Sequence, residues 1–125
     1  MSSRSVSTCE ASVTPRLLRN GNIVASAELA ATRAARRRGL LGRTGVDGVL
    51  VLEPCRQVHS FGMQFPIDVM FCDRHDRVLR VQTLKPGRVT RPVIRARRVL
   101  EADGGAAARW GIAVGDLLEV LEVPA

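Results

Sequence analysis

Short apolar runs, each bounded by turn-forming residues, constrain the fold of this chain more than any other feature. Val49–Leu52, Ile67–Cys72 and Leu117–Val123 are examples, and Gly, Pro or Asp lies beside each of them. Runs of this length are typical of β-strands, whereas helices need longer periodic segments. Further short strands are expected at residues 16–19, 23–25, 78–81 and 99–102, so the chain should contain about seven.

Helical signals are few and local. Thr32 is a suitable N-cap for a helix over Arg33–Arg38, and Gly39 can end it. Gly105–Trp110 should form one or two helical turns. Asn20-Gly21 between two apolar runs predicts a tight β-hairpin. Because helices do not alternate with the strands, the pattern predicts a mainly β fold, a compact antiparallel β-sandwich or distorted barrel with one or two short helices.

The length of 125 residues suits one domain. Residues 1–12 are rich in Ser and are expected to form a disordered tail, with a single domain over residues 13–125. The N-terminal stretch lacks the apolar segment of a signal peptide, and no apolar run is long enough to span a membrane. Cys9, Cys55 and Cys72 are scattered, unlike the paired cysteines of a disulfide scaffold. We therefore expect a reduced, cytoplasmic protein, monomeric by default.

The net charge of +7 is concentrated in one stretch. Arg74–Arg98 carries nine basic residues and one acidic residue, Asp76, whereas the segment from Glu101 onward is acidic. Such a balance attracts nucleic acid. The basic stretch contains no aromatic residue that could stack on bases, so nucleic-acid binding through Arg74–Arg98 is an alternative rather than the leading interpretation.

Four sequence pieces, in this order, resemble the bacterial and archaeal family called domain of unknown function 192. They are Arg38–Arg43 (RGLLGR), Phe65–Phe71 (FPIDVMF) followed by Asp73, Val99–Glu101 followed by Gly104 or Gly105, and Gly111-Ile112 with Gly115-Asp116. The resemblance covers roughly residues 16 to 123. It implies a compact β-rich fold and no established reaction. Many members carry Trp-Met-x-Asn-Thr where this chain has His59–Met63 (HSFGM), so roles of those residues do not transfer.

The segment His59–Asp68 is the leading candidate for a functional site. Gly62 and Pro66 shape this loop, which carries an imidazole, a thioether and a carboxylate. In the functional interpretation, His59, Met63 and Asp68 surround the mouth of a shallow pocket. In the structural interpretation, Met63 and its neighbours pack in the core and Asp68 accepts hydrogen bonds from backbone donors where the loop meets the strand.

Two further residues of the family-like pieces complete the candidate ligand-binding set. Arg43 could pair internally with Asp68 or Glu101, or hold an anionic ligand. Glu101 could converge with Asp68 in the same site. The candidate ligand-binding residues are therefore His59, Met63, Asp68, Arg43 and Glu101.

Metal and covalent chemistry are weaker alternatives. Cys55-x3-His59 and Cys72-x2-His75 have spacings that zinc accepts, but Cys72 falls within an apolar run. Cys55 with His59 could act as nucleophile and base, although nothing in the sequence orients the pair. The chain has no P-loop, dinucleotide fingerprint or serine elbow. We expect no cofactor and no metal site.

The sequence thus favours a binding or accessory module with a site near His59–Asp68, which takes an unknown small ligand or protein partner. Nucleic-acid binding through Arg74–Arg98 is the first alternative. A hydrolase or isomerase that uses His59 with a carboxylate is the second, and enzymatic activity is not the favoured interpretation.

Overall fold

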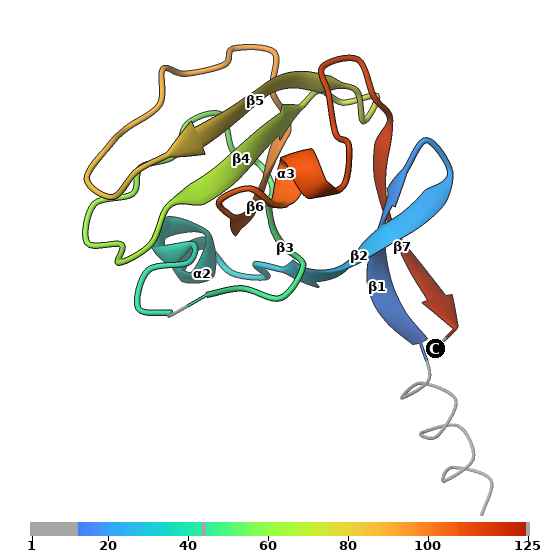
Figure 1. Ribbon diagram of the computed structural model, residues 1–125, viewed down its shortest axis with the longest axis horizontal. Coiled ribbons are helices and arrows are strands. Elements are labelled where there is room, and N and C mark those ends of the chain that lie inside the picture. Colours follow the sequence, from blue (N-terminus) through green and yellow to red (C-terminus); the bar gives the residue numbers. More distant parts are fainter. Residues whose placement is uncertain (1–12, 44, 125) are drawn as a thin grey trace, which may run out of the picture.

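The computed structural model describes residues 13–43 and 45–124, which form one β-sheet and two short helices (Figure 1). The expected tail over residues 1–12 and Cys9 lie outside these residues. The elements, in chain order, are β1 (Val13–Arg19), β2 (Asn22–Leu29), α2 (Arg33–Arg38), β3 (Val49–Leu52), β4 (Ile67–Cys72), β5 (Val78–Leu84), β6 (Arg98–Asp103), α3 (Ala106–Arg109) and β7 (Leu118–Pro124).

The seven strands lie in the order β5-β4-β6-β3-β2-β1-β7. All neighbours are antiparallel except β2 and β3, which are parallel. The two edge strands approach each other where they begin, because Arg77 and Leu117 form a bridge there. The sheet is therefore a curled half-barrel, which confirms the mainly β prediction in its distorted-barrel form. None of the helices in the described residues is long and apolar enough to cross a membrane.

Alternate residues of the central strands contribute their side chains to two separate hydrophobic cores. Val49, Val51, Met70 and Leu100 pack in the core beneath α3, together with Ala106 and Ala107 of that helix. Leu50, Leu52, Val69 and Val99 face the opposite core, which Leu40, Val58 and Met63 complete from the segments after α2 and β3. Successive side chains of a strand point to opposite faces, and both faces are covered here, so every residue of β3 and β4 is buried.

Local signals in the sequence place several of these elements. The Thr32 side chain accepts a hydrogen bond from the Ala35 N–H (3.0 Å), and Gly39 follows Arg38 as the C-cap of α2. Asn20 and Gly21 both have positive φ in the β1–β2 turn. The observed β4 has the predicted boundaries, Ile67–Cys72.

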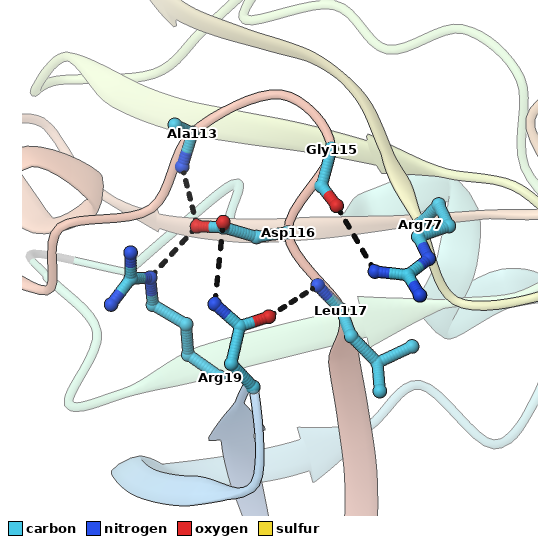
Figure 2. Close-up of polar contacts among 7 residues, drawn as sticks. Arg19, Arg77, Ala113, Gly115, Asp116 and Leu117 are labelled. Carbon is cyan, nitrogen blue, oxygen red and sulfur yellow. Dashed lines mark hydrogen bonds and ion pairs between the residues drawn. The ribbon is translucent and has the colours of Figure 1, made fainter.

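Asp116 ties the β1–β2 turn to the loop before β7 (Figure 2). Its carboxylate accepts hydrogen bonds from Arg19 Nε (2.7 Å), Asn20 Nδ2 (3.4 Å) and the Ala113 N–H (2.9 Å). Figure 2 also shows Arg77 donating to the Gly115 carbonyl oxygen, across the same loop. These bonds give Asp116 a structural role, and the Arg19 hydrogen bond lowers its pKa.

Candidate ligand-binding site

A cavity of about 690 Å³ lies on the face of the sheet beside α2. This volume is in the range of small-molecule sites. Its apolar lining comes from the segment after α2, from the segment between β3 and β4, and from the start of β4: Leu40, Leu41, Val58, Phe61, Met63 and Ile67. The cavity is therefore large enough for a small molecule, and its apolar walls suit the apolar part of such a molecule.

Glu101 of β6 supplies the acidic group of this cavity. The residue is only 3% exposed, and its Oε1 atom has no hydrogen-bond partner. Burial raises the pKa of Glu101 to about 7, against the opposing effects of a hydrogen bond from the Leu40 backbone and the charge of Arg43. A buried, unpaired carboxylate oxygen costs free energy unless a partner reaches it. Glu101 is thus the buried acid of the lining, with one carboxylate oxygen that forms no hydrogen bond within the described residues.

Gly39 makes room for this carboxylate. A Cβ atom at position 39 would lie 2.8 Å from Glu101 Oε1, closer than such contacts allow. The residue also has φ 52° and ψ −128°, a conformation open to glycine and strained for other residues. Glycine at position 39 therefore allows the end of α2 to pack directly against the Glu101 carboxylate on β6.

Positive charge surrounds the same cavity. Five arginines contribute to its lining: Arg33, Arg36, Arg37 and Arg38 from α2, and Arg56 from the segment after β3. Among the ion pairs of residues 13–43 and 45–124, none joins these five to an acidic side chain. The cavity thus combines one buried acid with five guanidinium groups that form no ion pair within the described residues.

His59 and Met63 line the cavity. Met63 is 8% exposed and belongs to the adjoining core. His59 is exposed, and its ring stacks on Phe61 with 5.1 Å between the ring centroids. Its Nδ1 atom accepts a hydrogen bond from the Phe61 N–H (3.2 Å), so a neutral imidazole carries its proton on Nε2. The stacked pair forms a flat aromatic part of the lining.

Asp68 and Arg43 do not line this cavity. Asp68 is 3% exposed, and its Oδ1 accepts from the Thr83 hydroxyl (2.7 Å). Its Oδ2 accepts from the N–H groups of Gly105 and Ala107, both at 3.0 Å, which holds the start of α3. Asp68 therefore accepts hydrogen bonds from backbone donors, as in the structural interpretation. These backbone donors lie at the start of α3, however, and not in the loop that precedes Asp68.

The register of the sheet explains why Asp68 and Glu101 do not converge. Val69 is the cross-strand partner of Glu101, whereas Asp68 is paired with Ala102. Paired residues point to the same face, and neighbours along a strand point to opposite faces. Asp68 consequently faces the α3 side of the sheet, and Glu101 faces the cavity side.

Arg43 pairs with neither Asp68 nor Glu101, contrary to the internal pairing expected from the sequence. Its guanidinium donates to both carboxylate oxygens of Glu28, at 3.0 and 2.8 Å. Glu28 is one of the two exposed residues at the end of β2, so the pair lies at the surface. Arg43 affects Glu101 only through its charge.

The cysteine and histidine pairs do not form a zinc centre. Cys72 is fully buried in the core beneath α3, whereas Cys55 and His59 line the cavity on the other face. No group of three His, Cys, Asp or Glu side chains within the described residues could hold a metal ion. Burial raises the pKa of the Cys55 thiol and raises that of Cys72 to about 12, so neither is a ready nucleophile.

The arginine side of the cavity was not expected from the sequence. In the sequence, Arg33–Arg38 is identifiable as a helix ended by Gly39, and Arg38–Arg43 as a family-like piece, but neither pattern predicts a binding site. That piece and the piece Val99–Glu101 meet in the cavity, through Gly39 and Glu101. The joint presence of both pieces was the available signal, but their contact depends on the fold.

The curled sheet and its cavity place the chain among small, mainly β single-domain proteins with a ligand-sized site. The chain belongs to the DUF192 family, described as "Uncharacterized ACR", whose profile matches residues 16–120. A UPF0127 protein from Pyrococcus horikoshii is 46% identical over 48 residues, which span 38% of this chain and 42% of that protein. The family expectation from the sequence is thereby confirmed.

Two solved structures share the fold. A protein of unknown function from Novosphingobium aromaticivorans is 28% identical, with a TM-score of 0.74 over 86% of this chain and 84% of that one. A protein from Sinorhizobium meliloti, described as a "putative transcription regulator", is 21% identical, with a TM-score of 0.71 over 87% and 95% of the two chains. At that identity the second likeness concerns the fold alone.

Proposed function

We propose that this protein is a binding module for a small anion with an apolar body and a hydrogen-bond donor. The observation that carries the proposal is the buried Glu101 Oε1 atom, which has no partner and belongs to an apolar cavity lined by arginines. His59 and Met63 remain in the proposed site, and Glu101 is its central group. Asp68 and Arg43 are left out, because their polar atoms already bind Thr83, α3 and Glu28.

The lining defines the ligand chemistry. Guanidinium groups bind carboxylate, phosphate or sulfonate strongly, so the anionic group belongs beside the arginines. The apolar walls and the His59–Phe61 pair favour a flat or aliphatic body. A hydroxyl or amine at the other end would satisfy Glu101 Oε1. A cation without an anionic group is disfavoured, because five arginines line the cavity.

Binding takes precedence over the hydrolase or isomerase alternative. Glu101 has the pKa of a possible proton-transfer group, and His59 lines the same cavity. However, His59 Nδ1 is bound to a backbone N–H, and no carboxylate of the described residues hydrogen-bonds the ring. The lining also contains no activated nucleophile, since burial raises the pKa of Cys55.

A pair of rigid probes tests the proposal. Hydroxynaphthoate, with its hydroxyl and carboxylate on opposite rings, has all three features, and naphthoate lacks only the donor. In amide NMR titrations at pH 8, we expect saturable shifts at Leu40, Leu41 and Met63. Hydroxynaphthoate should bind about tenfold or more tightly than naphthoate, because a hydrogen bond to a charged group contributes about 1.5–3 kcal/mol. Glu101→Gln should remove most of this difference.

Two tryptophan variants provide the matched control. Leu41 lines the cavity and is 37% exposed, so Leu41→Trp should obstruct the cavity and weaken both probes. Leu121 of β7 is 45% exposed and does not line it, so Leu121→Trp should leave both affinities unchanged. Equal effects of the two variants, or no saturable binding of either probe, would contradict the proposal.

A further inference from the structure

A second hollow, of about 380 Å³, lies between the β4–β5 turn and the loop that precedes β6. Four arginines contribute to its lining, together with one acidic, one imidazole and one large apolar side chain. The arginines are Arg56, Arg74, Arg95 and Arg97, and the others are Asp73, His75 and Ile94. We refer to this hollow as the basic groove. It touches the cavity described above only through Arg56, which lines both.

One acidic residue stands against the four arginines of the basic groove. Asp73 is the acidic residue of its lining, and Asp73 Oδ1 accepts from the backbone N–H groups of His75 (2.8 Å) and Arg77 (3.0 Å). That carboxylate therefore stabilises the turn. Arg97 lies 3.5 Å from Glu53, but the two side chains are 60% and 44% exposed, and such pairs are weak.

Two of the arginines are held in place through one edge of the guanidinium group. Arg56 Nε donates to the Ala96 carbonyl oxygen at 3.2 Å, and Arg74 Nε donates to His75 Nε2 at 3.3 Å. Both residues are exposed, so their terminal N–H groups face solvent. A guanidinium that is oriented in advance loses less conformational entropy when it binds a phosphate.

The structure also separates these arginines from others of the Arg74–Arg98 stretch. The Arg98 side chain is 11% exposed and pairs with Asp76 at 2.9 Å, and Arg80 lies over the Phe71 ring. Arg88 and Arg91 are exposed, but they do not line the basic groove. The arginines of Arg74–Arg98 therefore do not form one uniform patch. Three of them line the basic groove, together with Arg56 from the segment after β3.

We propose that the basic groove binds the sugar–phosphate backbone of double-stranded nucleic acid. Arginine forks match phosphate geometry, and a concave basic surface fits a projecting backbone. The lining contains no Phe, Tyr or Trp, so it offers no stacking platform for the unpaired bases of a single strand. An anionic membrane fits less well, because Ile94 is the exposed large apolar side chain of the lining and one such residue gives little insertion.

The test measures binding of a short fluorescent DNA duplex to the full chain by anisotropy, at several salt concentrations. We expect binding at low salt that weakens steeply as salt rises. The double variant Arg74→Ala/Arg95→Ala should weaken binding about tenfold or more and reduce the log–log salt slope by about 2, since each lost phosphate contact removes about one unit.

Arg88→Ala/Arg91→Ala is the matched control, because it removes the same charge from the same stretch outside the groove. It should change affinity less than threefold. Equal weakening by the two double variants would overturn the groove assignment and leave only general charge attraction. No binding of the duplex at low salt, tighter binding of the single strand, or binding only to phosphatidylglycerol vesicles would also overturn the proposal.

Discussion

Within residues 13–43 and 45–124, two buried side-chain atoms have no hydrogen-bond partner, Glu101 Oε1 and Arg98 Nε, and only Glu101 belongs to the lining of the cavity. Ser60, Asp68 and Thr90 are also buried, and each forms hydrogen bonds with other parts of the chain. Glu101 has a free Oε1 atom and sits against Gly39. Buried polar atoms without a hydrogen-bond partner are rare in natural proteins and occur mainly at functional sites.

The pH dependence of stability should reveal Glu101. Its pKa is about 7 in the folded protein and about 4.5 unfolded. Between these values the folded state binds more protons, so its stability is complete below pH 4.5 and falls as pH rises through 7, by up to about 3 kcal/mol. In urea unfolding at pH 5 and pH 8, Glu101→Gln should flatten this fall and exceed the wild type at pH 8. Parallel pH profiles for the two proteins would contradict the assignment.

Elements of the fold differ in how far local sequence determines them. The bounds of β4, the Thr32 cap of α2 and the Asn20-Gly21 turn follow from side-chain and backbone preferences of a few adjacent residues. The face on which a residue lies depends on register between distant strands. Glu101 and Asp68 were therefore both identifiable as candidates, whereas their separation by the sheet required the pairing of β4 with β6.

Asp68 connects three elements, and its loss should be costly. Asp68→Ala removes the acceptor for Thr83 on β5 and for two N–H groups at the start of α3. We expect a loss of about 2–4 kcal/mol in the free energy of unfolding, because three hydrogen bonds to a charged group are lost and the buried Ala107 N–H is left unpaired. Thr83→Val removes one of these bonds and should cost about 1 kcal/mol. Calorimetric or urea unfolding measures both, and a loss below about 1 kcal/mol for Asp68→Ala would refute this role.

At the scale of the whole molecule, the sheet has a buried centre and a more exposed end. Figure 1 shows β1, β2 and β7 at one side of the molecule, with β4, β5 and β6 at the other. The class of fold and the approximate number of strands followed from the short apolar runs. The strand order, with β6 between β4 and β3, and the parallel β2–β3 pair did not, because they depend on long-range contacts that no local pattern records.

Hydrogen exchange should follow this division. Every residue of β3 and β4 is buried, whereas β2 contains no fully buried residue. We expect amides of β4 and β6 to exchange about a hundredfold more slowly than those of β2, since sparsely packed elements open locally. Uniform protection across the sheet would show instead that all seven strands open as one unit.

An NMR titration of the Glu101 side-chain carboxyl carbon is the sharpest test of the proposed site. In the free protein the signal should titrate with a midpoint near pH 7. Saturation with naphthoate should raise the midpoint, because that probe adds a negative charge and no donor, and hydroxynaphthoate should raise it less or lower it. A midpoint near 4.5 that neither probe shifts would contradict the account.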